Sequence, residues 1–155
     1  MADSRPAQDV LSKDGIRLGL TAADKWDAIA QCGALLSDIG AVEPGYPRTM
    51  LEREGSVSTY VGEGVAIPHG TDAARALVRR TALGVLQFPG GVDWDAGTPV
   101  RVCVAIAAKG EEHITVLSAL AEVLLDPDRA ERLRTTTSVH TVYELLSTVG
   151  REVGA

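Results

Sequence analysis

One stretch of the sequence, Val100–Ala107, limits the possible folds more than any other because it carries apolar residues on both of its alternating faces. The two faces are Val100, Val102, Val104 and Ile106 on one side, and Cys103, Ala105 and Ala107 on the other. A strand that is hydrophobic on both sides is covered above and below in the folded protein. The sequence therefore predicts a central strand in an α/β protein that has helices on both faces of a mixed sheet.

The first third of the chain is predicted to be helical. Thr21 followed by Asp24 has the pattern of an N-cap, and Gly40 is the expected end of that helix. A second short helix is expected from near Pro47 to about Glu54, because proline fits the first helical position. Four residues at helical spacing are expected to face the core from the first of these helices: Trp26, Ile29, Gly33 and Leu36.

Shorter apolar segments follow, bounded by turn residues in the pattern that is typical of strands. The residues Gly62-Glu63-Gly64 predict a turn before the apolar run Val65–Ile67, and Ala82–Phe88 predicts a strand that Pro89-Gly90-Gly91 would end. Trp94 is expected in a loop, exposed to solvent.

The last third is again predicted to be helical. Apolar spacing predicts a helix over 114–125, Asp126-Pro127 predicts the start of another, and Ser138 is the expected cap of a final helix that ends at Gly150. The whole chain, residues 1–155, is interpreted as one domain, with poor order expected at 1–13 and 151–155.

Composition excludes several classes of protein. The 155 residues carry a formal net charge of −6, which argues against a nucleic-acid-binding surface. The apolar runs are too short to cross a membrane, and residues 1–13 lack the features of a secretory signal, so a cytoplasmic protein without membrane insertion is expected. The two cysteines, Cys32 and Cys103, form no disulfide framework and are interpreted as unreactive core thiols.

Three histidines are the main candidates for chemistry. His140 lies off the apolar stripe of the last helix and is expected to be exposed and inert. His69 lies between Pro68 and Gly70 at the end of an apolar run, where a ligand can approach the backbone. His113 begins a helix after the central strand, a place where the helix dipole favours neutral imidazole and binds anions.

Other chemistries have less support in the sequence. Arg53 has the planar guanidinium that suits phosphate, although an arginine alone is weak evidence. His69 and His113 lack a third ligand at metal-binding spacing, so no metal site is expected. The hydroxyl residues Ser56, Ser58 and Thr59 have no nearby base in sequence. A histidine nucleophile is the remaining hypothesis.

Two segments resemble a known family. Residues 51–71 read LEREGSVSTYVGEGVAIPHGT, and this run resembles the active-site segment of the IIA components of the bacterial sugar phosphotransferase system, mannitol/fructose class. Residues 107–121, AAKGEEHITVLSALA, resemble the family's second histidine segment. The resemblance extends from about Asp9 to Leu146. Within the class, Tyr60–Thr71 and Gly91–Trp94 are more similar to the mannitol branch, while Pro89-Gly90-Gly91 departs from the family by lacking an acidic residue.

The resemblance implies a fold and a role. It implies a mixed sheet of about five strands, a phosphoryl group accepted on His69 from the phosphocarrier HPr, and its transfer to a mannitol-type IIB component of a IIBC permease. His113 would hydrogen-bond at the site and Arg53 would face the phosphoryl group. The same motif assigns three further binding positions: Glu63, Gly70 and Thr71. No cofactor is implied, because HPr arrives already phosphorylated.

Other functions stay open at this point. A fructose-type or nitrogen-regulatory IIA domain would be phosphorylated in the same way but serve another partner. A module that binds a small anion at His69 and His113 without a covalent step is an alternative of a different class, and a metal hydrolase is the last.

Overall fold

The structure is a computed structural model that describes residues 10–94, 97 and 99–154, with side chains described as far as residue 149. Its centre is a five-stranded mixed sheet, as the family resemblance implied. The strands are β1 (Ile16–Arg17), β2 (Tyr60–Gly62), β3 (Val65–Ala66), β4 (Ala82–Val92) and β5 (Val100–Ala107), in the spatial order β1-β4-β5-β3-β2. The pairs β1–β4 and β3–β5 are parallel, whereas β4–β5 and β2–β3 are antiparallel.

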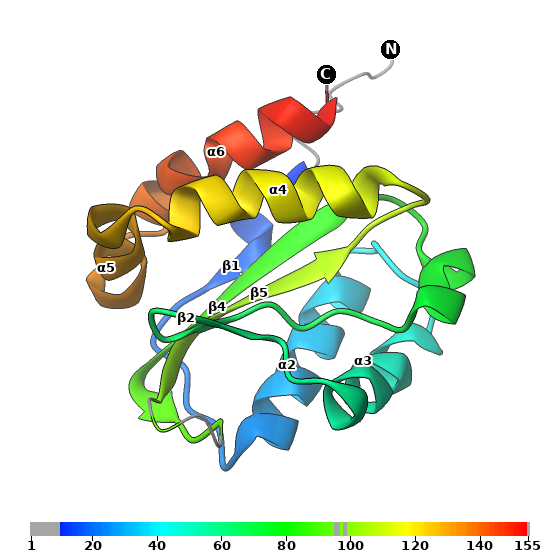
Figure 1. Cartoon of the computed structure of the whole chain (residues 1–155), viewed down its shortest axis with the longest axis horizontal. Helices are drawn as coiled ribbons and strands as arrows, with labels where there is room; N and C mark the ends of the chain where they lie inside the picture. Colours follow the sequence, from blue (N-terminus) through cyan, green and yellow to red (C-terminus); the bar gives the residue numbers. More distant parts are fainter. Residues whose placement is uncertain (1–9, 95–96, 98, 155) are drawn as a thin grey trace.

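Helices cover both faces of this sheet, as Figure 1 shows. They are α2 (Lys25–Asp38), α3 (Tyr46–Ser56), α4 (Glu112–Leu124), α5 (Pro127–Thr135) and α6 (Val139–Gly154), with short 3₁₀ helices η1 (Lys13–Gly15) and η2 (Asp72–Leu77). The pair α2 and α3 lies on one face, and α4 and α6 lie on the other, with α5 beyond one end of α4. The prediction of helices on both sides of β5 is confirmed.

The alternation of β5 places its side chains in two separate cores. Cys103 packs with Ile29 and Leu36 of α2, whereas Val104 packs with Leu120 of α4 and Leu146 of α6. All of these side chains are buried. Burying apolar surface on both sides of one strand joins the two helical layers into a single folded unit.

The prediction that Pro89-Gly90-Gly91 ends β4 is wrong. The strand continues to Val92, and its register with β5 shifts between Gln87 and Val92. Proline and glycine are accepted in such an irregular segment because its ladder hydrogen bonds are already interrupted. Val100 belongs to the core beneath α2, not to the face of Val102 where the simple alternation put it.

The start of α2 also differs from the prediction. Asp24, not Thr21, is the N-cap, and its carboxylate accepts a hydrogen bond of 2.9 Å from the Asp27 backbone N–H. The helix therefore begins at Lys25, and Trp26 lies in its first turn with 43% of its surface exposed. The expectation that Trp26 is a core residue is wrong, because the buried face of α2 begins at Ala28 and Ile29 and the ring of Trp26 lies outside it. The Lys25 ammonium lies 4.9 Å from the centroid of the Trp26 ring.

Trp94 shows the opposite error. It was expected to be exposed, but only 2% of its surface is accessible. Its indole N–H donates a hydrogen bond of 3.0 Å to a carboxylate oxygen of Glu54. A buried polar partner satisfies the indole nitrogen, so the ring is stable inside the protein.

The two ends of the chain are partly described. Val10 and Leu11 are buried core residues, and the expectation of poor order at 1–13 and 151–155 stays a prediction. Residues 1–9 and 155 lie outside the described part of the chain. Helix α6 runs to Gly154, beyond the predicted end at Gly150.

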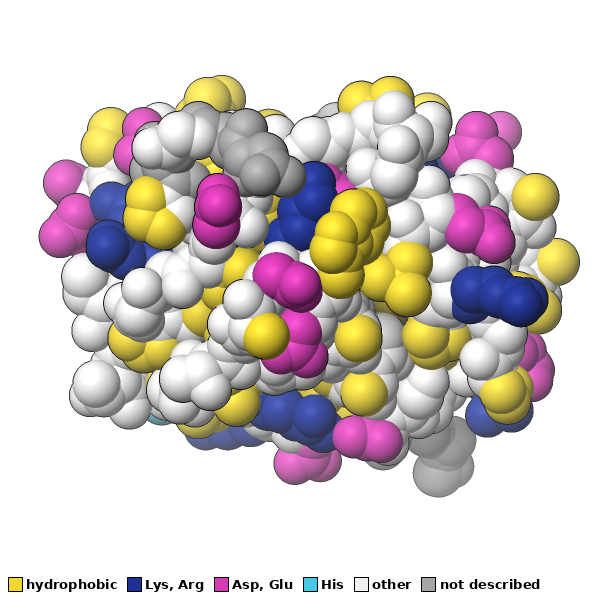
Figure 2. Space-filling model, turned by 90° about the horizontal axis from the view of Figure 1, so that it is seen from below, with side chains coloured by type: hydrophobic (Ala, Val, Ile, Leu, Met, Phe, Trp, Pro, Cys, Tyr) yellow, Lys and Arg dark blue, Asp and Glu magenta, His cyan; other side chains and the backbone are white. Residues whose placement is uncertain are grey.

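The surface formed by α2 and α3 has no uniform charge. Figure 2 shows acidic and basic side chains interspersed on this face, with exposed hydrophobic side chains between them. None of the helices in the described residues is long and apolar enough to pass through a bilayer.

Candidate functional site

The position of His69 is set by the two parallel strands β3 and β5. After β3 the chain continues alongside the end of β5, where the Ile106 N–H donates to the Pro68 carbonyl at 2.9 Å. His69 itself forms an isolated parallel bridge with Ile106. Ligand sites in open α/β sheets gather beyond the carboxyl ends of the strands, and His69 lies at such an end.

The imidazole of His69 is held in one orientation by the backbone. Its Nδ1 lies 2.8 Å from the Ile67 carbonyl oxygen. A carbonyl oxygen only accepts hydrogen bonds, so Nδ1 carries the proton and donates it. In the neutral ring the lone pair then belongs to Nε2, which makes Nε2 the nucleophilic nitrogen.

His113 is the second residue of α4, just after the loop that follows β5. Thr81 Oγ1 holds this loop by accepting a 3.0 Å hydrogen bond from the Lys109 N–H and by donating to Glu112. As a result, the ring of His113 approaches that of His69, with 5.1 Å between ring centroids and 56° between ring planes. Two histidines separated by 44 positions in sequence form one site.

Burial is the main cause that lowers the pKa of His69 below its ordinary value of 6.5. The positive charge of Arg53 and the ring of His113 lower this pKa further, whereas the hydrogen bond to Ile67 and the negative charge of Asp72 oppose the change. The balance favours neutral imidazole, the form with a lone pair available for reaction.

The pKa of His113 is also lowered, first by burial and then by the positive charge of Arg75, with a smaller contribution from Arg53 and an opposing one from Asp72. The sequence predicted the neutral form from the helix dipole. The direction agrees with that prediction, but the charged side chains of α3 and η2 supply the electrostatic causes found here.

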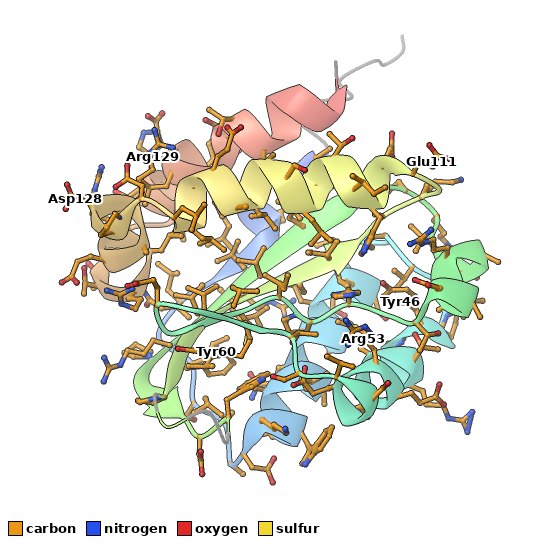
Figure 3. The ribbon with its side chains drawn as sticks, viewed as in Figure 1. Tyr46, Arg53, Tyr60, Glu111, Asp128 and Arg129 are labelled. Atoms are coloured by element: carbon orange, nitrogen blue, oxygen red, sulfur yellow. The ribbon has the colours of Figure 1, made fainter. Side chains whose placement is uncertain are left out.

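Arg53 projects from the last turn of α3, and its Nη1 donates to the Val57 carbonyl at 2.5 Å. Figure 3 shows Arg53 and Tyr46 on the side of α3 that faces the extended segment following β3. The positive charge of Arg53 lowers the pKa of both histidines. The structure thus brings the rings of His69 and His113 into contact, and Arg53 acts on both through its charge.

Tyr46 is a site residue that the sequence did not indicate. Its buried hydroxyl accepts a 2.8 Å hydrogen bond from the Gly70 N–H and donates one of 3.0 Å to the Ile106 carbonyl. Gly70 packs so closely that a Cβ at this position would lie 2.6 Å from Thr49 Oγ1 and 2.7 Å from the Tyr46 ring. The glycine is therefore required by close packing, and Tyr46 fixes the segment immediately after His69.

Asp72 and Arg75 of η2 also went unnoticed in the sequence. Their side chains form an ion pair of 3.3 Å, and both charges affect the pKa of His113. Their only signal in sequence is nearness to His69, because no spacing rule predicts that charges on η2 act on His113 of α4. Thr71, expected to be a binding residue, is the half-buried N-cap position of η2.

Glu63, also expected at the binding site, lies at the turn between β2 and β3 with a φ of 56°. Arg134 Nη1 donates a hydrogen bond of 2.6 Å to the Glu63 carbonyl oxygen and lies 3.7 Å from the Glu63 carboxylate. Its contacts are thus with α5, at the opposite end of β3 from His69.

An apolar groove of about 370 Å³ lies between the β2–β3 hairpin and α4. Two of its lining residues are near the histidines in sequence. Ile67 is two residues before His69, and Leu117 is one helical turn after His113. Glu63 lines its far part, together with Leu125, which is 81% exposed. A partly exposed apolar surface beside a reactive group has the character of a protein-docking face.

The remaining candidates lie away from this site or inside the core. A hydrogen bond between the Cys103 and Cys32 side chains, together with burial, raises the pKa of the Cys103 thiol well above its ordinary range, consistent with unreactive core thiols. His140 is exposed and lies 3.5 Å from the Glu144 carboxylate. Within the described residues, no three His, Cys, Asp or Glu side chains gather as a metal site.

Residues 9–149 match the sequence profile of the family described as phosphoenolpyruvate-dependent sugar phosphotransferase system, EIIA 2. The chain belongs to this EIIA 2 family. The match includes every residue of the site, from Tyr46 to His113. The family resemblance of the two histidine segments is therefore confirmed.

Relatives of this EIIA 2 chain are similar over most of its length. A mannitol-specific phosphotransferase enzyme IIA component from Halalkalibacterium halodurans is 41% identical over 143 residues, which cover 92% of this chain and 98% of that protein. A multiphosphoryl transfer protein from Rhodobacter capsulatus is 43% identical over 145 residues, 94% of this chain. The EIIA 2 chain spans only 18% of the length of that second relative.

The fold is also that of a solved EIIA structure. The enzyme IIA chain in an NMR structure of the complex of enzyme IIA-Mtl and phosphorylated enzyme IIB-Mtl from Escherichia coli is 40% identical. The match covers 88% of this chain and 96% of that chain, with a TM-score of 0.82. The five-stranded mixed sheet and its helical layers are therefore the architecture of the EIIA 2 family.

Proposed function

We propose that this chain is a phosphocarrier that accepts a phosphoryl group from phospho-HPr on Nε2 of His69 and donates it to a mannitol-type IIB component. The observation that carries the proposal is the fixed tautomer of His69. Its Nδ1 bonds to the Ile67 carbonyl at 2.8 Å, which leaves the Nε2 lone pair as nucleophile. Membership of the EIIA 2 family supports the same chemistry.

The transfer exchanges one N–P bond for another. The Nε2 lone pair of His69 forms a bond to phosphorus as the N–P bond of the donor histidine breaks, and the electron pair of that bond returns to the donor ring. Nδ1 keeps its proton throughout, so the phosphorylated ring gains positive charge. The Ile67 carbonyl oxygen, already hydrogen-bonded to Nδ1–H, stabilises that charge.

The negative charge of the transferred group needs positive partners. Phosphoryl transfer passes through a loose transition state with charge spread over three oxygens, so catalysis depends on positioning and electrostatics. Arg53 supplies a guanidinium whose positive charge acts on both histidines, and a neutral His113 would offer a ring N–H to the phosphoryl oxygens. The role of Arg75 would be to keep His113 neutral.

The relatives and the surface support the proposed partner and sugar. One relative is a mannitol-specific IIA component, and the E. coli structure is a complex of IIA-Mtl with phosphorylated IIB-Mtl. The apolar groove beside His69 and His113 provides a surface on which HPr and IIB would dock in turn. These reactions take place in the cytoplasm, where HPr delivers the phosphoryl group and IIB receives it.

The proposal is tested by incubating the chain with enzyme I, HPr and labelled phosphoenolpyruvate. The wild-type chain should acquire a phosphate that is labile in acid and stable in base. H69A should acquire none, whereas H113A should accept label but transfer it poorly to IIB. The matched control is H140A, which removes an exposed histidine and should behave as wild type.

The same experiment separates the alternatives. Rapid donation to a mannitol-type IIB, with slow donation to a fructose-type IIB, supports the mannitol branch. A labelled chain that donates to neither would be a regulatory IIA domain. Phosphate binding without covalent label would indicate an anion-binding module and would refute the proposed transfer.

A further inference from the structure

We propose that Glu54 is a positioning residue that fixes the imidazole of His69 through Thr59 and Ile67. The proposal rests on the proposed function of His69. Glu54 is 4% exposed, and it is the one acidic or basic side chain that is fully buried in the described part of the chain. Burial of a carboxylate carries a free-energy penalty unless hydrogen bonds compensate it, so its surroundings indicate what it holds in place.

The carboxylate of Glu54 is surrounded by hydrogen-bond donors. The Thr59 hydroxyl donates at 2.6 Å, and the Thr59 backbone N–H lies 3.2 and 3.3 Å from the two carboxylate oxygens. The Trp94 indole N–H donates at 3.0 Å, and the Lys25 ammonium lies 4.0 Å away. Thr59, itself 4% exposed, is the residue most completely fixed by this carboxylate.

The hydrogen bonds continue from Thr59 to the nucleophile. The Thr59 carbonyl accepts a 3.0 Å hydrogen bond from the Ile67 N–H. The Ile67 carbonyl, in turn, accepts the 2.8 Å hydrogen bond from Nδ1 of His69. Both polar groups of Ile67 are thus engaged, one toward Thr59 and one toward the imidazole. A shift of Thr59 would move the carbonyl that selects the His69 tautomer.

The same carboxylate holds the segment that contacts Arg53. Glu54 follows Arg53 directly on α3, and its bonds to Thr59 close the short segment 57–59 against the end of the helix. Val57, the first residue of that segment, supplies the carbonyl that accepts from Arg53 Nη1 at 2.5 Å. One buried carboxylate therefore supports both the nucleophile and the guanidinium expected to face the phosphoryl group.

The test compares E54Q with E52Q. Both substitutions remove one negative charge from α3, but Glu52 is exposed, so E52Q is the control for charge. The first readout is ¹⁵N NMR of ring-labelled histidine, which reports which nitrogen of His69 carries the proton. The second is the rate of phosphorylation by phospho-HPr, separated into kcat and KM.

We expect E54Q to give His69 a detectable population with the proton on Nε2. We also expect its kcat to fall by about 10-fold, with KM nearly unchanged, because misplacement of a reacting group slows the chemical step. E52Q should match wild type in both readouts. Wild-type His69 signals and wild-type kcat in folded E54Q would overturn the proposal.

A second pair of variants keeps the proposal testable if E54Q does not fold. T59V removes the hydroxyl that donates a hydrogen bond to Glu54 and keeps the side-chain shape, whereas T59S retains the hydroxyl. T59V should shift the His69 tautomer in the same direction as E54Q, and T59S should restore the wild-type signals. Equal spectra for T59V and wild type would overturn the proposal.

The two proposals fail in different ways. The NMR readout needs no phosphoryl donor, so it reports on Glu54 even if HPr does not phosphorylate the chain. If phospho-HPr does not phosphorylate the wild-type protein, the proposed function is refuted. If the wild-type protein is phosphorylated but the His69 nitrogen signals of E54Q and T59V equal those of wild type, the role of Glu54 is refuted.

Discussion

Nδ1 of His69 lies 2.8 Å from the carbonyl oxygen of Ile67, two residues earlier in the chain. Since the backbone of His69 is held by a bridge to Ile106 of β5, the imidazole cannot rotate without losing this bond. The bond assigns different roles to the two ring nitrogens. Nδ1 is a fixed donor, and Nε2 is available for reaction.

Loss of Arg53 should change both the pKa of His69 and its reactivity. Arg53 lowers this pKa through its positive charge, so R53Q should raise the pKa of His69 toward 6.5. Removing a group that stabilises charge in the transition state typically slows a reaction by about 10²-fold, and we expect a loss of that order in kcat. NMR titration of His69 and single-turnover phosphorylation would measure the two effects.

R53K serves as the companion variant. A lysine retains the positive charge but lacks the planar fork that bonds to the Val57 carbonyl. The pKa of His69 should therefore remain low in R53K, while kcat still falls. A normal kcat in R53K would show that charge alone accounts for the effect of Arg53.

The protein should lose stability as pH falls. Burial and nearby positive charges lower the pKa of His69 and His113 in the folded state. Between those lowered values and about 6.5 the unfolded chain binds more protons than the folded one, so the free energy of unfolding rises with pH across this window. Urea denaturation at several pH values would measure the slope.

The double variant H69Q/H113Q isolates the contribution of the two rings to this slope. It removes both titrating groups, so its stability should change less with pH between 5 and 7 than that of wild type. An identical slope would mean that other groups, such as surface carboxylates, account for the whole effect.

Removal of the Tyr46 hydroxyl should destabilise the fold. Y46F leaves the buried Gly70 N–H and the Ile106 carbonyl without their partner, and an unsatisfied buried group costs about 1–3 kcal/mol. Y60F is the matched control, because the half-buried Tyr60 hydroxyl makes one longer bond of 3.3 Å to Gly64. Urea denaturation should therefore rank Y46F well below Y60F, and equal stabilities would contradict the role of Tyr46.

Alanine substitution at Gly70 and at Gly55 should change the stability of the protein in opposite directions. G70A places a Cβ 2.6 Å from Thr49 Oγ1, so we expect a loss of about 1–3 kcal/mol through overpacking, and slower phosphorylation because His69 is displaced. G55A lies in α3 with open space around its Cβ and should stabilise the helix by about 0.5–1 kcal/mol. Melting curves of the two variants would test this, and a G70A protein as stable and active as wild type would contradict the close packing.

Much of the fold was predictable because its signals are local. The two apolar faces of Val100–Ala107 predicted a covered central strand, and Asp126 before Pro127 predicted the start of α5, where the Asp126 carboxylate accepts from the Asp128 N–H at 3.0 Å. Both depend on residues close in sequence. The errors at Trp26 and Trp94 arose because burial depends on distant partners, in the second case on Glu54.

The candidate site was predictable only in part for the same reason. The histidine motifs identified His69 and His113, but spacing alone does not reveal that their rings lie 5.1 Å apart. Tyr46 reaches Gly70 across 24 positions of sequence, and its helix gives no sign of this role. Glu54 was read only as the end of a helix, because its burial becomes visible when Thr59 and Trp94 are brought around it.

The central claim is that Nε2 of His69 is the atom that receives the phosphoryl group. The most direct measurement is ¹⁵N and ³¹P NMR of the chain with ring-labelled histidine after phosphorylation by HPr, because one-bond phosphorus–nitrogen coupling identifies the bonded nitrogen. Coupling to Nε2 of His69, with Nδ1 still protonated, is the predicted result. Coupling to Nδ1, or to any nitrogen of His113, would contradict the account.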